Sequence, residues 1–381
     1  MAKRKKLANI LLFLLLVVFP FGRLFGHSID IIVGLIMLYT LFFRLEKPPI
    51  FKYFDNFLIA AIFSYLFSLF VFKSTLVLVG GLYLIRLIAY TYLFVFCLNW
   101  VEKSSKKKQL ILHSLLALSV ITAVFGWLQY FIYPDARQLA VFGWDDHLYR
   151  IIGTFLDPAF TALFLVFGAT IAVYQYFSSR KKVFLWLTVF LSVTLAFTYS
   201  RASYLAFLFM LLSVGILTKK LKTIAIFIIL FLIMVLALPR PAGEGVKLER
   251  TFSINARLIN YREGLTIFKK SPLLGIGFNN LCLAKKEFLG KEEFTSHSCS
   301  GLDSSLLAIL VTTGVCGFLI FIKVAWEVLR TLNPKSLFGK ILFSSCLALF
   351  VHSLFTNSLF YPWTMVYLVM LLSLEKFDFR D

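Results

Sequence analysis

The chain has few charged residues for its length. Among its 381 residues, Asp, Glu, Lys and Arg make up only 15%, whereas a soluble globular domain usually has about 25%. This scarcity excludes an ordinary soluble protein. Hydrophobic residues make up 60% and aromatic residues 17% of the chain, which excludes a disordered protein, because such chains are poor in both. The composition therefore predicts a polytopic membrane protein.

Acidic residues are scarcer than basic ones. Nineteen Asp and Glu oppose 39 Lys and Arg, giving a formal net charge of +20. In a soluble protein this excess would indicate a nucleic-acid partner. Here the basic residues form short clusters between apolar runs, which is typical of loops that face anionic lipid headgroups. We therefore expect membrane lipids, and no nucleic acid, as partners.

The five cysteines lack a metal-binding spacing, since no CxxC pair and no neighbouring His cluster occurs. Cys97, Cys316 and Cys346 lie in apolar runs and resemble small hydrophobic residues. Cys282 and Cys299 can pair with each other if their segment faces an oxidising compartment. We expect no metal site.

Long apolar runs divide the chain into twelve candidate spans, since a transmembrane helix needs about 20 predominantly apolar residues. The first run follows four basic residues but precedes no small-residue cleavage motif, so we interpret it as an uncleaved helix. Nine spans fall in residues 1–238 and three in residues 303–381, on either side of a hydrophilic segment, residues 239–302. The candidate spans are roughly 7–22, 27–43, 55–72, 75–100, 110–133, 158–178, 183–199, 202–218, 222–239, 303–326, 337–358 and 361–375.

The positions of the basic residues predict the orientation. With the N-terminus in the cytoplasm, the cytoplasmic segments contain 22 Lys and Arg and the short outer loops contain five. Cytoplasmic loops usually have such an excess, and a miscounted helix would invert every later loop. We therefore expect an all-α protein of about twelve transmembrane helices in the bacterial cytoplasmic (inner) membrane, with both termini in the cytoplasm.

Two predicted outer segments are longer than turns, residues 133–157 and residues 239–302. The second is the largest hydrophilic stretch of the chain, and a loop of this length in a compact protein is usually functional. Within it, residues 255–268 have apolar side chains at helical spacing, which predicts a helix against the bilayer surface. Pro272 ends this helix, and residues 273–277 predict a turn.

Four arginines are candidates for binding an anion. Arg86 lies within a predicted span, where a cation costs several kcal/mol unless it is paired or hydrated, so it is either functional or paired with a carboxylate. Arg201 lies at a predicted outer junction and alternatively anchors lipid headgroups. Arg257 and Arg262 lie in the large loop and alternatively form a solvated face. Guanidinium pairs can grip phosphate groups bidentately.

Two further residues are candidates for moving a proton. His297 and Asp303 lie near the end of the large loop, and an imidazole or a carboxylate can take a proton from a hydroxyl group. Asp303 precedes an apolar run, so it is alternatively a helix N-cap, a task that Ser304 or Ser305 could share. An exposed loop position is the alternative for His297.

Four segments, in this order, resemble motifs of the O-antigen ligase and polymerase superfamily. Residues 150–158, RIIGTFLDP, resemble its R-x-x-G-T-F-x-N/H-P element, and residues 198–201, TYSR, resemble its T-x-S-R element. Residues 255–277 resemble its R-x-x-x-W-x-x-A and P-L-x-G-x-G segment, with Tyr261 at the Trp position. Residues 303–317 resemble its closing H-N-S-Y-L and G-x-x-G segment.

This resemblance implies a metal-independent glycosyltransferase of the GT-C-like transmembrane fold, without a cofactor. Family members take a glycan from undecaprenyl pyrophosphate and attach it to lipid A-core, in lipopolysaccharide ligases, or to another repeat unit, in surface-polysaccharide polymerases. The pyrophosphate-binding arginines of the family correspond to Arg201 and Arg257. The family's catalytic His corresponds to Asp303, with His297 six residues upstream, a departure that favours the polymerase side and leaves the identity of the base open.

We therefore predict glycan transfer from undecaprenyl pyrophosphate to a sugar hydroxyl by an inverting mechanism, with His297 taking the proton and Asp303 orienting the acceptor or the imidazole. Arg201, Arg257, Arg86 and Arg262 are the predicted binding residues for the pyrophosphate or glycan.

A transporter or flippase of lipid-linked sugars is the alternative, and it predicts internal repeats and broken helices near the midplane. A non-catalytic scaffold is a third possibility. Few charged residues other than Arg86 and Lys323 lie inside the spans, and the rest gather mainly at the predicted span ends and loops, which favours transfer over transport.

Overall fold

The computed structural model describes residues 2–102, 104–142, 147–241, 243–249, 251–290 and 301–375. In these ranges the chain forms helices and no strand, apart from one isolated bridge between Asp135 and Leu148. The α-helices are α1 (Ala2–Val18), α2 (Ser28–Phe42), α3 (Phe51–Val71), α4 (Val77–Val101), α5 (Ser105–Ile132), α6 (Pro158–Ser179), α7 (Lys182–Ala196), α8 (Arg201–Thr218), α9 (Leu221–Ala237), α10 (Phe252–Phe268), α11 (Leu281–Leu289), α12 (Ser305–Thr331), α13 (Leu337–Ser353) and α14 (Pro362–Leu372). The 3₁₀-helices are η1 (Phe19–Phe25), η2 (Arg137–Phe142), η3 (Gly153–Phe155) and η4 (Glu244–Val246).

The predicted all-helical fold is confirmed. In the described ranges, seven helical segments are long and apolar enough to cross a membrane: α1 continued into η1, α3, α4, α5, α6, α8 and α12. Five shorter apolar helices, α2, α7, α9, α13 and α14, fall on the other five predicted stretches. That these five also cross the membrane, giving twelve spans, stays a prediction.

Large apolar side chains cover much of the outside of the bundle. Phe42, Phe70 and Ile132 are each more than three quarters exposed, and many other large apolar residues on the apolar helices are about half exposed. Contiguous apolar surface of this extent is rare on soluble proteins. It fits a surface that faces lipid chains.

The centre of the bundle is α6, which is buried along almost its whole length and packs against α5, α7, α8 and α13. Its sequence is apolar on all sides, as expected of a helix that is surrounded by protein. Hydroxyl pairs satisfy the few polar groups there, such as Tyr174 and Ser344, whose oxygens lie 2.8 Å apart. α6 therefore forms a rigid centre around which the helix ends are arranged.

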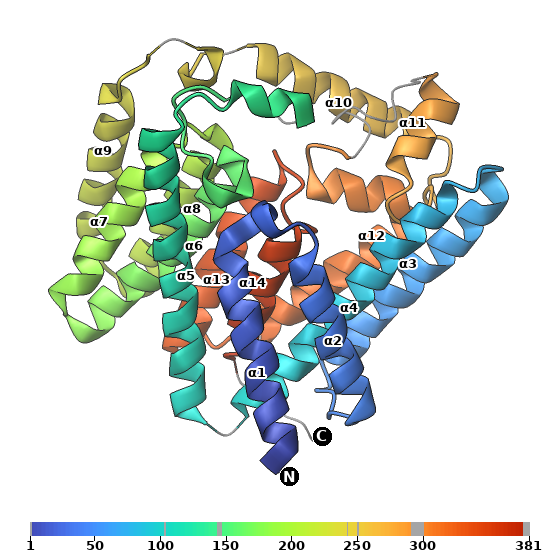
Figure 1. Ribbon diagram of the computed structural model, residues 1–381, viewed down its shortest axis with the longest axis horizontal. Coiled ribbons are helices and arrows are strands. Elements are labelled where there is room, and N and C mark those ends of the chain that lie inside the picture. Colours follow the sequence, from blue (N-terminus) through green and yellow to red (C-terminus); the bar gives the residue numbers. More distant parts are fainter. Residues whose placement is uncertain are drawn as a thin grey trace.

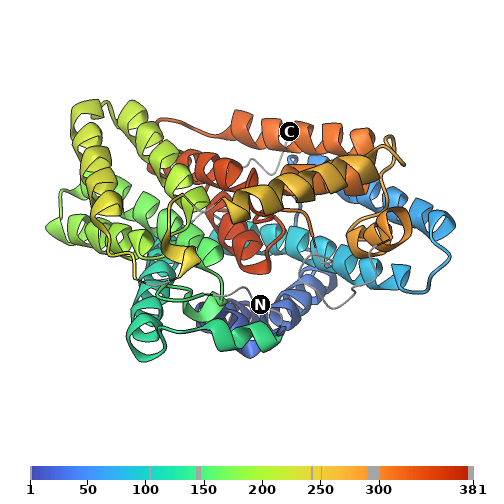
Figure 2. The same cartoon turned by 90° about the horizontal axis from the view of Figure 1, so that it is seen from above.

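The two ends of the bundle differ. At one end, the Tyr39 hydroxyl in α2 donates to the carbonyl oxygen of Arg4 (3.1 Å), and Lys108 in α5 donates to that of Leu374 (2.8 Å). At the opposite end α10 and α11 lie above the helix ends (Figure 1), and Figure 2 shows α10 lying across the bundle. The first helix therefore begins, and the described chain ends, at the end opposite α10.

Candidate functional site

A tight turn between α7 and α8 positions Arg201 as the first residue of α8. Tyr199 has a positive φ of 51° in this turn. The side chain of the buried Arg150 forms hydrogen bonds to the backbone of the turn. The Arg150 Nε atom donates to the carbonyl oxygen of Thr198 (3.0 Å), and its Nη2 atom donates to that of Tyr199 (3.4 Å). The first two family-like motifs therefore contact each other, and Arg150 has a structural task in shaping the second.

The end of the first motif caps α6. The carboxylate of Asp157, the N-cap residue, accepts hydrogen bonds from the backbone N–H groups of Ala159 (2.7 Å) and Phe160 (3.1 Å). Pro158 follows at the first helical position, where its missing N–H leaves no intrahelical hydrogen bond unmade. This part of the motif fixes where α6 begins beside the turn that holds Arg201.

Arg201 lies against the face of α10 that carries Arg257. The Arg201 Nη1 atom donates to the carbonyl oxygen of Leu248 (2.9 Å) and its Nη2 atom donates to the Ser253 hydroxyl (2.6 Å). Arg257 lies one helical turn beyond Ser253, on the same face of α10, and its charge acts on Arg201. Both arginines are half-buried. The large loop and the turn before α8 therefore place two like charges close together.

Neither arginine is neutralised within the described ranges. No carboxylate there lies within ion-pair distance of Arg201 or Arg257, and Arg257 makes no hydrogen bond to a described residue through its guanidinium group. Two neighbouring cations repel each other, and the repulsion is stronger where water is partly excluded. A bound anion would remove this cost.

Tyr261 links the arginine pair to Asp303. It lies one turn beyond Arg257, and its hydroxyl donates to the carbonyl oxygen of Leu354 (2.6 Å). Burial raises the pKa of Tyr261, the positive charge of Arg257 opposes this shift, and the negative charge of Asp303 adds to it. Asp303 and Arg257 therefore both lie within electrostatic range of the same hydroxyl group.

Asp303 is not the N-cap of α12. The cap is Ser304, whose hydroxyl oxygen accepts a hydrogen bond from the backbone N–H of Leu307 (3.4 Å). The backbone N–H of Asp303 donates to the Asn260 side-chain oxygen on α10 (2.8 Å), which fixes the residue against that helix. The N-cap of α12 is therefore Ser304, and the capping alternative for Asp303 is wrong.

Three other candidates lie elsewhere. His297 lies outside the described residues. Arg86 donates to the Asp30 carboxylate (2.6 Å), so the paired alternative holds for it, and its part in donor binding stays a prediction. Arg262 is exposed and, five residues after Arg257, points about 140° away around α10.

A second carboxylate near the site, that of Glu263, forms an ion pair within the loop. It forms an ion pair with the buried Lys285 of α11 (3.7 Å), and Lys285 also donates to the carbonyl oxygen of Gly301 (3.2 Å). This pair joins α10 and α11 to the segment before Asp303. No group of three His, Cys, Asp or Glu side chains in the described ranges is arranged to hold a metal ion.

One cysteine of the loop is bonded. Cys282 is disulfide-bonded, whereas Cys97, Cys316 and Cys346 are free. The remaining cysteine of the sequence, Cys299, lies outside the described residues, so the pairing with it stays a prediction.

Comparison with known families supports the resemblance seen in the sequence. Residues 183–322 match the family model described as O-antigen ligase. Over this range, which is 140 of the 381 residues, the predicted resemblance to the O-antigen ligase and polymerase superfamily is confirmed. The matched range begins in α7 and ends in α12, and it includes Arg201, Arg257 and Asp303. No curated protein matches the chain.

A buried histidine outside the matched range also contacts the site, and the sequence motifs gave no sign of it. His352, at the end of α13, has its Nε2 atom 3.0 Å from the Ser203 hydroxyl and its Nδ1 atom 3.0 Å from the Ser358 hydroxyl. The charge of Arg257 acts on it. His352 therefore joins α13 to the first turn of α8, directly after Arg201. The available signal was a histidine inside a predicted apolar span, residues 337–358.

The two glycine-containing segments that resemble family motifs, residues 272–277 and 314–317, pack together at an interruption of α12. The helix is interrupted at Gly314, which has φ 66° and ψ −173°. The loop that follows α10 enters this break: the N–H groups of Ile276 and Gly277 donate to the carbonyl oxygens of Val311 (3.1 Å) and Thr312 (3.0 Å). On the other side, the N–H of Val315 donates to the carbonyl oxygen of Pro272 (2.8 Å). The predicted turn at 273–277 is confirmed, and it satisfies the backbone groups of the broken helix.

Gly314→Ala is expected to destabilise the protein by about 2–4 kcal/mol, because an added Cβ would overlap the carbonyl oxygen of Leu273 and the backbone conformation is one that only glycine adopts readily. Gly290→Ala is the matched control, since Gly290 also has φ 66° but has open space around it; its cost should be about 1 kcal/mol. Thermal unfolding in detergent measures both. Equal losses in the two variants would contradict the packing of the loop into the break.

Proposed function

We propose that this protein transfers a glycan from undecaprenyl pyrophosphate to an acceptor sugar hydroxyl on the outer face of the bacterial cytoplasmic membrane. The match of residues 183–322 to the O-antigen ligase family model supports glycan transfer in general. The observation that supports the pyrophosphate donor is the meeting of Arg201 and Arg257 without a carboxylate partner in the described ranges. Two guanidinium groups match a pyrophosphate in charge and can bind its oxygens bidentately.

The proposed reaction is a direct displacement at the anomeric carbon. The acceptor oxygen attacks this carbon from the side opposite the pyrophosphate, the bond from carbon to phosphate oxygen breaks, and its electron pair leaves with the pyrophosphate. Arg201 and Arg257 stabilise the charge that develops on the leaving group. The configuration at the anomeric carbon is inverted, and no metal or cofactor is needed.

The hydroxyl proton requires an acceptor close to the arginines. Asp303 is supported by its position, since its backbone is fixed to α10 by Asn260 and its charge reaches Tyr261. We propose that His297 takes the proton and that Asp303 orients the acceptor hydroxyl or the imidazole ring. Asp303 at the place of the family's His favours a polymerase over a ligase.

We also propose that α10 lies on the extracytoplasmic side and that both termini are cytoplasmic. The excess of basic residues in the predicted inner segments supports this orientation. The contacts of Arg4 and of Leu374 at the end opposite α10 agree with it, as does the disulfide bond of Cys282.

Cysteine labelling tests this orientation. In spheroplasts, a membrane-impermeant maleimide should label Glu249→Cys, at an exposed position before α10, without permeabilisation. Lys106→Cys, at an exposed position near the start of α5, should be labelled only after permeabilisation. The reverse pattern would contradict the proposed topology.

The transfer proposal is tested with the purified protein, a synthetic undecaprenyl-pyrophosphate glycan and an acceptor glycan in the presence of a chelator. A new glycosidic bond, formed together with free undecaprenyl pyrophosphate, supports transfer. Movement of the intact lipid-linked glycan across a liposome membrane without a new bond would support the transporter alternative.

A further inference from the structure

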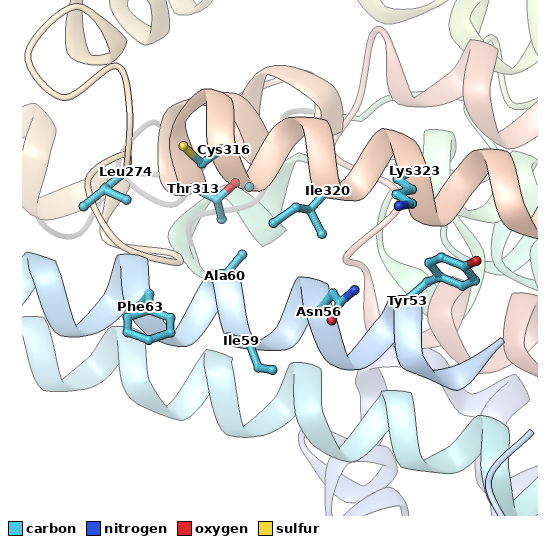
Figure 3. A pocket seen from close by; sticks show the side chains of 11 residues that line it. Tyr53, Asn56, Ile59, Ala60, Phe63, Leu274, Thr313, Cys316, Ile320 and Lys323 are labelled. Carbon is cyan, nitrogen blue, oxygen red and sulfur yellow. The ribbon is translucent and has the colours of Figure 1, made fainter. Parts of the chain in front are cut away.

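A groove lies between α3 and α12, and neither the two arginines Arg201 and Arg257 nor Asp303 lines it. Its volume is about 440 Å³. Figure 3 shows α3 and α12 forming its two walls, with Leu274 of the loop at one end. The side chains along most of its length are apolar or small, among them Ile59, Ala60, Phe63 and Ile320.

Polar groups gather at the other end of the groove. Tyr53, Asn56 and Lys323 lie together there (Figure 3), with the Lys323 ammonium 5.7 Å from the centre of the Tyr53 ring. Among the described residues no carboxylate lies within ion-pair distance of Lys323. Glu327, one turn further along α12, does not pair with it either. A lysine within a membrane-spanning helix is costly unless a counter-charge or water stabilises it.

The length of the groove matches one leaflet of a bilayer. Its residues on α3 run from Tyr53 to Phe63 and those on α12 from Thr313 to Lys323, and ten residues of helix are about 15 Å long. The hydrocarbon core of a bilayer is about 30 Å thick, so one leaflet contributes about half of this. The groove is therefore long enough for a hydrocarbon chain from one leaflet.

The polar end of the groove belongs to the end of the bundle opposite α10. Tyr53 lies in the first turn of α3. The chain just before α3 contacts the end of α4, where the Asn99 amide donates to the carbonyl oxygen of Glu46 (2.8 Å). Lys107 of α5 contacts the same end of α4. The cation of the groove therefore lies at the end away from Arg201 and Arg257.

We propose that this groove binds an anionic phospholipid of the leaflet opposite α10, with its phosphate at Lys323 and one hydrocarbon chain against Ile59, Phe63 and Ile320. The charge of Lys323 favours a headgroup of net negative charge over a zwitterionic one. A lipid-linked donor held at Arg201 and Arg257 has its anionic group at the other end of the bundle, so it is not the occupant. In the topology proposed above, the leaflet opposite α10 is the cytoplasmic one. The lipid binding itself does not depend on that topology.

Native mass spectrometry of the full-length protein in detergent tests the proposal, with phosphatidylglycerol and phosphatidylcholine of the same chain length as probes. Lys323→Gln should weaken phosphatidylglycerol binding roughly fivefold and leave phosphatidylcholine binding unchanged. Lys323→Arg should retain the preference, and Ala60→Phe, which fills the groove, should weaken both lipids. Lys182→Gln is the matched control, because Lys182 is exposed and does not line the groove.

Three results would overturn the proposal: unchanged phosphatidylglycerol binding in Lys323→Gln, equal binding of both lipids to the wild-type protein, or displacement of phosphatidylglycerol from the groove by undecaprenyl phosphate. The Lys323→Arg and Ala60→Phe variants decide the matter if Lys323→Gln does not fold. None of these variants changes Arg201 or Arg257. A failure of the lipid-binding prediction therefore leaves the glycan-transfer proposal untouched, and a failure of glycan transfer leaves the lipid-binding proposal untouched.

Discussion

Arg257→Lys is expected to lower glycan transfer by about 100-fold or more while the protein inserts and folds normally. The guanidinium group of Arg257 makes no hydrogen bond or ion pair to a described residue, so the substitution removes little that holds the fold together. Lysine keeps the charge but cannot reproduce the planar two-pronged contact with a pyrophosphate. Losing one preorganised donor to a developing charge usually costs about 10²–10³ in rate. Initial rates of transfer from a synthetic undecaprenyl-pyrophosphate glycan measure the effect.

Arg262→Lys is the matched control for this prediction. Arg262 lies on the same helix, is exposed and points away from Arg257, so its replacement should leave the rate within about twofold of wild type, as surface substitutions away from a site usually have small effects. Arg201→Lys should also lose transfer, with some loss of stability, because Arg201 holds Leu248 and Ser253 as well. Full turnover in both Arg201→Lys and Arg257→Lys would refute the assignment of the pyrophosphate site.

Asp303→Asn is expected to lower transfer by about 100-fold or more with unchanged thermal stability. Asparagine has nearly the same shape and keeps the backbone N–H that donates to Asn260, but it removes the negative charge. Since Ser304 caps α12, the change leaves the helix start intact. The measurements are the transfer rate and the unfolding temperature of the same preparation.

Ser304→Ala separates the chemistry from the capping. It removes the cap hydrogen bond to Leu307 and should cost about 1 kcal/mol of stability while transfer continues. His297→Ala should lower transfer if His297 is the base. Normal transfer in both Asp303→Asn and His297→Ala would leave this segment without a catalytic group, and the base would then have to be sought among other residues, Glu263 first.

Features that depend on local patterning were predictable from the sequence. The long apolar runs predicted the helices, because length and hydropathy alone decide them. The helix in the large loop, its end before Pro272 and the turn at 273–277 were also predicted correctly, since proline restricts the backbone and glycine permits the positive φ values that turns need.

Features that depend on contacts between distant residues were not predictable. Arg86 pairs with Asp30, 56 residues away, and no local pattern indicates which carboxylate a buried arginine meets. His352 contacts Ser203, 149 residues away, and it lies in no motif. The task of Arg150, which holds the backbone of the turn before α8, likewise requires the packing of two loops.

The break in α12 shows the same limit. The sequence placed Gly314 in the closing family-like segment, but only the packed structure shows that α12 is interrupted there and that the segment from Pro272 to Gly277 forms hydrogen bonds with the backbone on both sides of the break. The transporter alternative predicted broken helices, and this break is filled by backbone from the loop.

The most direct test of the claim that Arg201 and Arg257 hold a pyrophosphate is a binding measurement with the reaction's lipid product. Undecaprenyl pyrophosphate and undecaprenyl monophosphate have the same hydrocarbon chain, so their difference in affinity reports the extra phosphate alone. We predict that the wild-type protein binds the pyrophosphate at least about tenfold more tightly, and that Arg257→Lys loses this preference while Arg262→Lys and Lys323→Gln keep it. Equal affinity of the wild-type protein for the two lipids, or an unchanged preference in Arg257→Lys, would contradict the account.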